Sequence, residues 1–267
     1  MFADAHCHPY DLVRVLPQAE QEFNSGEILA ASSACTFEEF LFSEELARNV
    51  PARVFPCFGI HPQYIKARNE SKEDIKDLIE KIDLLALEKR IFAVGECGFD
   101  LFNAAFRETE ARQDEVFAEH LETAIRHDLP VVLHARRAMH KIFALTKILS
   151  KCKAVVFHSW PGTLDEAQAF LRRGVNAYFS FGNAIMLNHK QAIKSCSLLP
   201  AERLLTETDA PYQPRRTEAY SCPADLPLIL NTAAALRTEA GNKIDAKELE
   251  LQIEKNFLKI FNRLVQH

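Results

Sequence analysis

Short apolar runs of strand length alternate along most of the chain with longer segments in which apolar residues recur at helical spacing. The apolar runs number eight and lie at residues 2–8, 27–33, 53–59, 91–97, 130–136, 154–159, 175–181 and 203–209. Helical spacing is clearest between them at residues 71–89, 107–128, 138–151 and 163–173. Because a tight hairpin cannot join parallel strands, this alternation favours parallel pairing through helical crossovers. The pattern therefore predicts an α/β fold in which eight repeats close into a single (β/α)8 TIM barrel.

The last part of the chain, residues 246–264, places apolar residues on one helical face that would cover the final strand. The chain has 267 residues, which is close to the roughly 250 that are typical of such a barrel. We expect one domain over residues 1–267, with two small domains as the alternative. The content of 48% hydrophobic and 26% charged residues is ordinary for a protein with a substantial core, so it indicates neither a disordered nor a fibrous protein.

Charge and cysteine content narrow the class of protein further. The formal net charge of -5 argues against broad attraction to nucleic acid, although a local basic rim or bound cations could still receive phosphate. The apolar runs are too short to span a membrane and the first residues show no signal-peptide pattern, so we expect a cytoplasmic protein without membrane association or an obligate protein partner. The seven cysteines are scattered and odd in number, which favours reduced thiols over a disulfide framework.

Histidine or carboxylate side chains follow most of the strand-like runs at the point where each run ends. His6 and His8 share one face of the first run, because side chains alternate along a strand. Later runs lead to five more such residues, which are His61, Glu96, His134, His158 and Asp209. Parallel strands of a barrel deliver their C-terminal ends to one mouth, so these side chains should converge. Each alone has an ordinary explanation as a packed histidine, a loop glutamate or a capping aspartate, but their recurrence favours a metal site.

Several neighbouring residues are expected to have structural roles. Alternation should point Cys7 and Cys97 away from the adjacent ligand candidates, so we expect these cysteines to pack rather than to bind metal. Glu207, two positions before the final aspartate, is expected to be a supporting or structural carboxylate. Trp160 and Phe181 are candidates for stacking on a nucleic-acid base, but we favour packing in the core or in a lid for both.

Taken in order, the motifs at the strand ends resemble those of the TatD-related metal-dependent hydrolases, a family of the amidohydrolase-like barrel superfamily. The resemblance spans nearly the whole chain. It rests on His6-Cys7-His8, Gly59-Ile60-His61-Pro62, Gly95-Glu96-Cys97-Gly98-Phe99-Asp100, Leu133-His134-Ala135-Arg136, Phe157-His158, Tyr178-Phe179-Ser180-Phe181-Gly182 and Glu207-Thr208-Asp209-Ala210-Pro211. No single block is decisive, but their ordered combination is highly specific.

The resemblance implies a centre of two divalent metal ions bridged by Glu96. The ligands implied for one ion are His6, His8, Glu96 and Asp209, and those implied for the other are Glu96, His134 and His158. The catalytic residues implied besides Glu96 are Asp209, which would orient the attacking water or accept its proton, and His61, which would face the substrate or leaving group. Arg136 would bind an anionic substrate, with a surface ion pair as its alternative role.

The implied activity is that of a divalent-metal-dependent hydrolase, with a deoxyribonuclease as the leading hypothesis. Its substrate would be DNA or another phosphodiester, attacked by hydroxide formed at the two ions. Four histidine ligands favour Zn, Mn, Fe or Co, while Mg is less expected. A hydrolase of a small ester, amide or lactone is the first alternative, because the acidic net charge does not demand nucleic acid. A noncatalytic, metal-stabilised interaction protein is the second alternative.

Two segments depart from the family pattern near the implied substrate pocket. After Asp209, relatives often carry an Arg-Gly-Lys/Arg-x-Asn-Glu-Pro-like segment, whereas this chain reads Gln213-Pro214-Arg215-Arg216-Thr217-Glu218-Ala219-Tyr220. Arg215 and Arg216 are the residues that could compensate. The block His158-Ser159-Trp160-Pro161-Gly162 likewise replaces a His-Cys-Phe-Ser-Gly-like sequence. The metal centre therefore matches the family better than the substrate pocket does.

Overall fold

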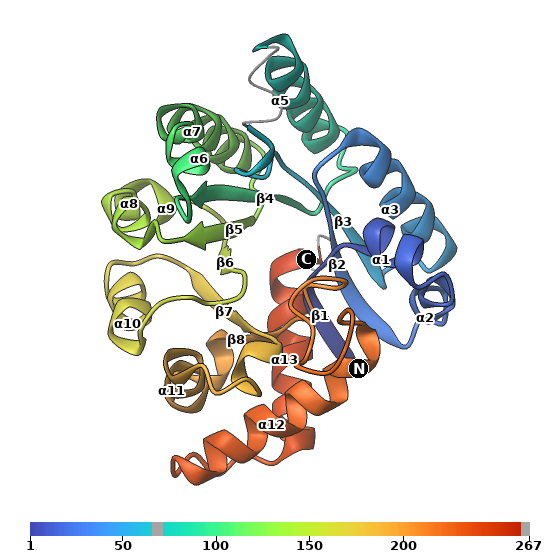
Figure 1. The fold of residues 1–267 in the computed structure, drawn as a ribbon, viewed down its shortest axis with the longest axis vertical. Coiled ribbons are helices and arrows are strands. Elements are labelled where there is room, and N and C mark those ends of the chain that lie inside the picture. Colours follow the sequence, from blue (N-terminus) through green and yellow to red (C-terminus); the bar gives the residue numbers. More distant parts are fainter. Residues whose placement is uncertain (66–71, 263–267) are drawn as a thin grey trace.

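Eight parallel strands form one nearly closed barrel in the computed structural model, which describes residues 1–65 and 72–262 (Figure 1). The strands pair in chain order and are β1 Phe2–Cys7, β2 Ile28–Ala34, β3 Val54–Phe58, β4 Ala93–Asp100, β5 Val131–Arg136, β6 Val155–Phe157, β7 Ala177–Phe181 and β8 Leu204–Thr206. β8 returns beside β1, where the Thr206 hydroxyl donates to the Ala3 carbonyl over 2.6 Å. The eight predicted strands and the barrel are confirmed.

Helices surround the sheet on its outer side (Figure 1). The helices are α1 Pro9–Val15, α2 Ala19–Asn24, α3 Phe37–Asn49, α5 Lys72–Leu87, α6 Ala104–Arg107, α7 Glu110–Arg126, α8 Met139–Ala144, α9 Thr146–Leu149, α10 Leu164–Arg172, α11 Lys190–Leu198, α12 Leu226–Glu239 and α13 Ala246–Phe261, with 3-10 turns η1 Asn183–Ile185, η2 Ala201–Arg203 and η3 Pro223–Asp225. The helical segments predicted before β4, before β5, after β6 and at the end of the chain are confirmed at α5, α7, α10 and α13. The predicted ends at Ser71 and Leu264 lie outside the described residues.

The helical segment predicted at 138–151 contains two short helices, α8 and α9, instead of one. They are separated at Leu145, which has φ -94° and ψ 5°. Next to it, the Thr146 hydroxyl donates to the Phe143 carbonyl over 3.1 Å. This local side-chain bond lies where the two helices separate.

The barrel core is apolar, and every residue of β2, β3, β4 and β7 is buried. Strands covered by helices on one side and by the barrel interior on the other are expected to be apolar throughout. Cys7 and Cys97 are fully buried, as expected for cysteines that pack in the core, and the seven cysteines, all among the described residues, form no disulfide. Trp160 and Phe181 are also buried, and the Trp160 indole N–H donates to Ser195 Oγ over 3.2 Å. Both aromatic side chains therefore pack in the core, and little of either is exposed for stacking on a base.

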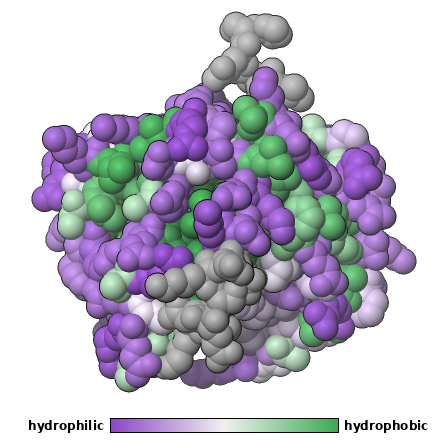
Figure 2. Space-filling model, turned by 90° about the horizontal axis from the view of Figure 1, so that it is seen from above, coloured by the Kyte–Doolittle hydropathy of each residue, from purple (hydrophilic) through white to green (hydrophobic). Residues whose placement is uncertain are grey.

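Hydrophilic side chains dominate the face of the molecule in Figure 2, with smaller hydrophobic groups between them. Within the described part of the chain, no helix is both long enough and apolar enough to cross a membrane.

A buried histidine of α7, His120, ties that helix to the loop after β3. Its Nε2 accepts a hydrogen bond from the Ile60 backbone N–H over 2.9 Å, and its Nδ1 lies 2.6 Å from the Val116 carbonyl oxygen. Because Nε2 accepts, the ring proton must sit on Nδ1 and donate to that carbonyl. Burial lowers the pKa of His120 to about 4, so the ring is neutral near pH 7. His61 follows Ile60 directly, so His120 fixes the backbone that carries a candidate site residue.

We predict that the free energy of unfolding decreases as the pH falls from about 6.5 to about 4, because His120 is protonated in the unfolded chain before it is protonated in the folded protein. In this window the unfolded chain binds a proton at His120 that the folded chain excludes, so the free energy of unfolding decreases. At full effect the free energy of unfolding decreases by about 3 kcal/mol. The pKa of His120 differs by about 2.5 between the unfolded and the folded chain, and each pKa unit corresponds to about 1.4 kcal/mol. Urea unfolding of the wild type and of His120→Gln at about pH 7 and about pH 4.5 measures the effect.

Glutamine cannot titrate, so His120→Gln should show a smaller change in stability between the two pH values than the wild type. His140→Gln, at an exposed position of α8, is the matched control for loss of an imidazole. An identical pH dependence in His120→Gln and the wild type would contradict the assignment.

Candidate metal centre

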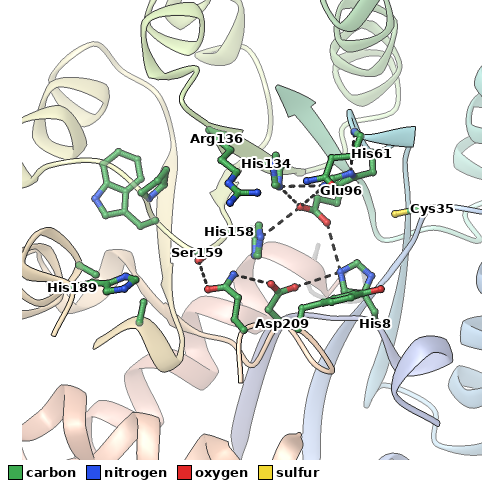
Figure 3. Close-up of a pocket in the computed structure, with 18 of the residues that line it drawn as sticks. His8, Cys35, His61, Glu96, His134, Arg136, His158, Ser159, His189 and Asp209 are labelled. Atoms are coloured by element: carbon green, nitrogen blue, oxygen red, sulfur yellow. Dashed lines mark hydrogen bonds and ion pairs between the residues drawn. The ribbon is translucent and has the colours of Figure 1, made fainter. Parts of the chain in front are cut away.

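The C-terminal ends of the strands open into a cavity of about 870 Å³. The six predicted metal ligands and His61 meet at this end of the barrel (Figure 3). They lie in or directly after β1, β3, β4, β5, β6 and β8, and they are His6, His8, His61, Glu96, His134, His158 and Asp209. Side chains up to 203 residues apart are thus brought together by the parallel barrel.

Glu96 lies at the centre of the cluster, and its two carboxylate oxygens face different histidines. Oε1 lies 2.7 Å from His134 Nδ1, 3.3 Å from His61 Nε2 and 3.5 Å from His158 Nε2. Oε2 lies 3.2 Å from His6 Nε2. A carboxylate with ligand nitrogens on both sides has the arrangement required to bridge two cations.

Asp209 completes the side of the cluster that contains His6 and His8. Its Oδ1 lies 3.4 Å from His6 Nε2 and 3.5 Å from His8 Nε2, and His8 Nε2 lies 3.6 Å from Glu96 Oε2. Its Oδ2 accepts a hydrogen bond from Gln213 Nε2 over 2.7 Å. The Asp209 backbone N–H donates to the His6 carbonyl over 2.9 Å, so the loop after β8 is fixed directly to β1.

Further polar side chains hold the cluster histidines in place. Ser33 Oγ lies 3.0 Å from His6 Nδ1. Glu207 Oε1 lies 3.2 Å from His158 Nδ1 and accepts a hydrogen bond from the Ser159 N–H over 2.7 Å. Glu207 therefore has the supporting position that the sequence predicted. A hydrogen bond such as the one between Ser33 and His6 sets the orientation and tautomer of an imidazole whose other nitrogen faces a metal.

Asp100 is a site residue to which the sequence analysis assigned no role. Its Oδ2 lies 3.3 Å from His134 Nε2 and accepts a hydrogen bond from Gln63 Nε2 over 2.7 Å. The predicted strand ended at Cys97, whereas β4 continues to Asp100. Extending the strand period of two from Glu96 would have placed Asp100 on the same face as Glu96, so a signal was available.

The buried carboxylates are ionised because histidines surround them. Burial alone would raise the pKa of Glu96, but His61 and its neighbours hold this pKa well below the usual value. Burial likewise opposes ionisation of Asp209, while His158 and His6 keep its pKa below the usual range. Without cations on the imidazoles, two carboxylates this close would be costly to bury.

The pKa values of the cluster histidines are shifted in different directions. Burial would lower the pKa of His6, but Glu96 and the adjacent aspartate raise it well above its usual value. Burial also opposes charge on His134, whose contacts with Asp100 and Glu96 raise its pKa to about 9. At His61 burial dominates and lowers the pKa. Protons on His6 and His134 thus balance the carboxylates, and a divalent cation would take their place because only an unprotonated nitrogen binds metal.

The donor atoms fit divalent metal ions. Three groups of described residues each bring their ligand atoms within 4.8 Å of one another, and these are His6-Glu96-His158, His6-His8-Asp209 and His61-Glu96-His134. Imidazole nitrogen and carboxylate oxygen are the donors that Zn, Mn, Fe and Co accept together. The buried cluster therefore suggests a site for one or more divalent metal ions, and it includes His61 beside the six predicted ligands.

Arg136, the candidate substrate-binding arginine, and Arg215 and Arg216, which could compensate for the missing family motif, lie in different places relative to the cavity. Arg136 lines the cavity, 47% exposed, with its guanidinium carbon 3.7 Å from the centre of the Phe102 ring. Arg215 instead pairs with Asp225 over 3.0 Å. Among the described residues that line the cavity, neither Arg215 nor Arg216 is present. These two arginines therefore do not replace the missing family motif inside the cavity.

The chain matches the family model described as TatD related DNase over residues 3–262. Proteins named 3'-5' ssDNA/RNA exonuclease TatD from Erwinia tasmaniensis and Dickeya dadantii are 30% and 31% identical to it. These alignments cover 94% of this chain in both cases, and 94% and 92% of the two relatives. An uncharacterised metal-dependent hydrolase from Methanocaldococcus jannaschii is 27% identical, over 98% of this chain and 97% of that protein.

Solved structures agree with these sequence relationships. A TatD homologue from Escherichia coli K12 superposes with a TM-score of 0.82 at 26% identity and covers 98% of both chains. A TatD family hydrolase from Entamoeba histolytica superposes with a TM-score of 0.76 at 16% identity, over 98% of both chains, which supports the fold. Since the family model spans nearly all of the chain and relatives at 30% identity match it almost from end to end, the chain belongs to the TatD-related DNase family.

Proposed function

We propose that this protein is a divalent-metal-dependent exonuclease that hydrolyses single-stranded DNA or RNA from the 3' end. The observation that carries the proposal is the two-sided carboxylate of Glu96, with histidine nitrogens within 3.3 Å of each oxygen at the mouth of the barrel. Relatives at 30% identity that match 94% of the chain bear the name of this activity. The cavity of about 870 Å³ is large enough to receive a nucleotide.

The ligand sets proposed for two ions share Glu96. One set is His6, His8, Glu96 and Asp209, and the other is Glu96, His134 and His158, with His61 beside Glu96 Oε1. Bound divalent ions would polarise a phosphoryl oxygen and lower the pKa of water towards about 7. The four histidines favour Zn, Mn, Fe or Co over Mg as the resident ions.

The chain's own side chains then have defined roles in phosphodiester hydrolysis. Asp209 is kept ionised and can accept the proton of the attacking water, while Gln213 holds its second oxygen. His61 lines the cavity with its Nε2 3.3 Å from Glu96 Oε1, and it would face the phosphate or the leaving oxygen. The Arg136 guanidinium projects from β5 into the cavity and can pair with a phosphate oxygen.

Substitution of the central carboxylates should abolish nuclease activity. We predict that Glu96→Gln and Asp209→Asn each lower kcat on a labelled single-stranded oligonucleotide by about a thousandfold or more. Product ladders obtained with Mg, Mn, Zn and Co would measure the loss. Glu119→Gln, a carboxylate on the exposed face of α7, should retain wild-type activity.

Absence of product from wild-type protein of verified metal content, with every ion and with both DNA and RNA, would refute the nuclease proposal. Hydrolysis of small esters, amides or lactones by the same protein would then support the alternative substrate class for this site.

Measurements of metal binding should show whether Glu96 is shared by the two proposed ions. We predict that the wild type takes up two ions per chain, that Glu96→Gln weakens binding of both by more than about tenfold, and that His134→Ala removes one. Calorimetry combined with elemental analysis of dialysed protein measures the stoichiometry. A single ion per chain, or full uptake by Glu96→Gln, would rule out the bridging arrangement.

A further inference from the structure

Two tyrosines stand out among the aromatic residues at this end of the barrel because their rings are accessible. Tyr64 is 37% exposed and Tyr212 is 47% exposed, and both line the cavity. By contrast, Trp160 and Phe181 are each only 3% exposed. An accessible ring inside a cavity offers a flat apolar face to a ligand, which a packed core ring cannot do.

Tyr212 is held rigidly beside the metal cluster. Its hydroxyl donates to Asp11 Oδ2 over 2.8 Å, and its backbone N–H donates to the Asp209 carbonyl over 2.6 Å. Its ring meets His8 edge to face, with centroids 5.3 Å apart and an interplanar angle of 79°. The side chain is therefore fixed at both ends, by α1 and by the loop after β8, so little side-chain freedom remains to be lost when a ligand binds.

Tyr64 has a corresponding relationship to His61. The Tyr64 backbone N–H donates to the His61 carbonyl over 3.0 Å, and the two rings meet at 75° with centroids 5.9 Å apart. Each tyrosine thus sits against a different histidine, and both histidines contact the Glu96 carboxylate in the cavity that the two tyrosines line.

The charges lining the cavity are divided between two sides. Figure 3 shows Arg136 and His189 on one side of the cluster and His8 and Cys35 on the other. Lys190 follows His189 and also lines the cavity. On the His8 side, the lining residues include the tyrosines, Asp11, and Glu39, whose carboxylate accepts a hydrogen bond from the Cys35 N–H over 2.6 Å.

This division matches the two halves of a nucleotide. A phosphate is repelled by carboxylates and attracted by Arg136 and Lys190, whereas a neutral base can stack on an aromatic ring regardless of its identity. We propose that Tyr212, positioned by Asp11, forms with Tyr64 a subsite that stacks the terminal base of a single strand while the backbone runs along the Arg136 side. The subsite rests on the proposed nuclease function, and it favours frayed or single-stranded ends because a paired terminal base must first be unpaired and unstacked to enter the cavity.

The experiment compares two single-stranded oligonucleotides that differ only in whether the 3'-terminal nucleotide carries a base or is abasic. For the wild type we expect kcat/KM to be about tenfold to a hundredfold higher for the terminus that carries a base. Tyr212→Leu should lose most of that advantage, with little change on the abasic terminus. Tyr212→Phe keeps the ring but not the bond to Asp11, so it should show a smaller loss.

Tyr10→Leu is the matched control, since Tyr10 bonds to Glu38 and is absent from the described cavity lining. It should behave as the wild type on both termini. Equal cleavage of both termini by the wild type would overturn the subsite and leave the nuclease proposal intact. An equal loss on both termini in Tyr212→Leu would show that the residue acts structurally, which also overturns the subsite. Failure of the wild type to cut either oligonucleotide would instead refute the proposed function, and the subsite with it.

Discussion

The structure of the site depends on the burial of one carboxylate, Glu96, which is only 3% exposed. A buried ionised group is stable only when charged partners or metal ions compensate for its lost hydration. Here five histidines place a ring nitrogen within 3.6 Å of its oxygens, and they are His6, His8, His61, His134 and His158. In this protein the ligands come from several strands that end at one barrel mouth.

Close packing of the strands is what brings these ends together. At Gly98 a Cβ would lie 2.3 Å from the His134 carbonyl oxygen, and the residue has φ +132°, which side chains rarely adopt. Glycine at this position therefore allows β4 to approach β5 between Glu96 and Asp100. The same approach puts His134 between the two carboxylates, with one nitrogen facing each. Backbone geometry and site electrostatics are thus determined by the same few residues.

The period of the apolar residues was sufficient to predict the strands, because each strand of a covered parallel barrel is buried along its length. The same period predicted strand ends less well, because polar residues become more frequent there. The strand was predicted to end at Cys97, whereas β4 continues to Asp100, which therefore was not recognised as a site residue. Contacts between distant elements had no signal of their own. The hydrogen bond from Ile60 to His120 joins residues 60 positions apart. An isolated histidine in a helical segment gives no indication of which distant residue it will contact. Candidate ligands that recur at strand ends could therefore be predicted from the sequence. The residues that orient these ligands were harder to predict.

The acidic net charge of -5 requires that any attraction for nucleic acid be local. Among the described residues that line the cavity, none of the cations comes from the loop after β8, where Arg215 is bound to Asp225 and Gln213 bonds to Asp209 and Ser159. Positive charge is instead concentrated on β5 and at the start of α11, across the cluster from the carboxylates near α1. For the proposed substrate, this placement would attract the phosphate backbone to the Arg136 side and repel it from the Asp11 side. Local placement of charge, rather than its total, would reconcile an acidic protein with the proposed anionic substrate.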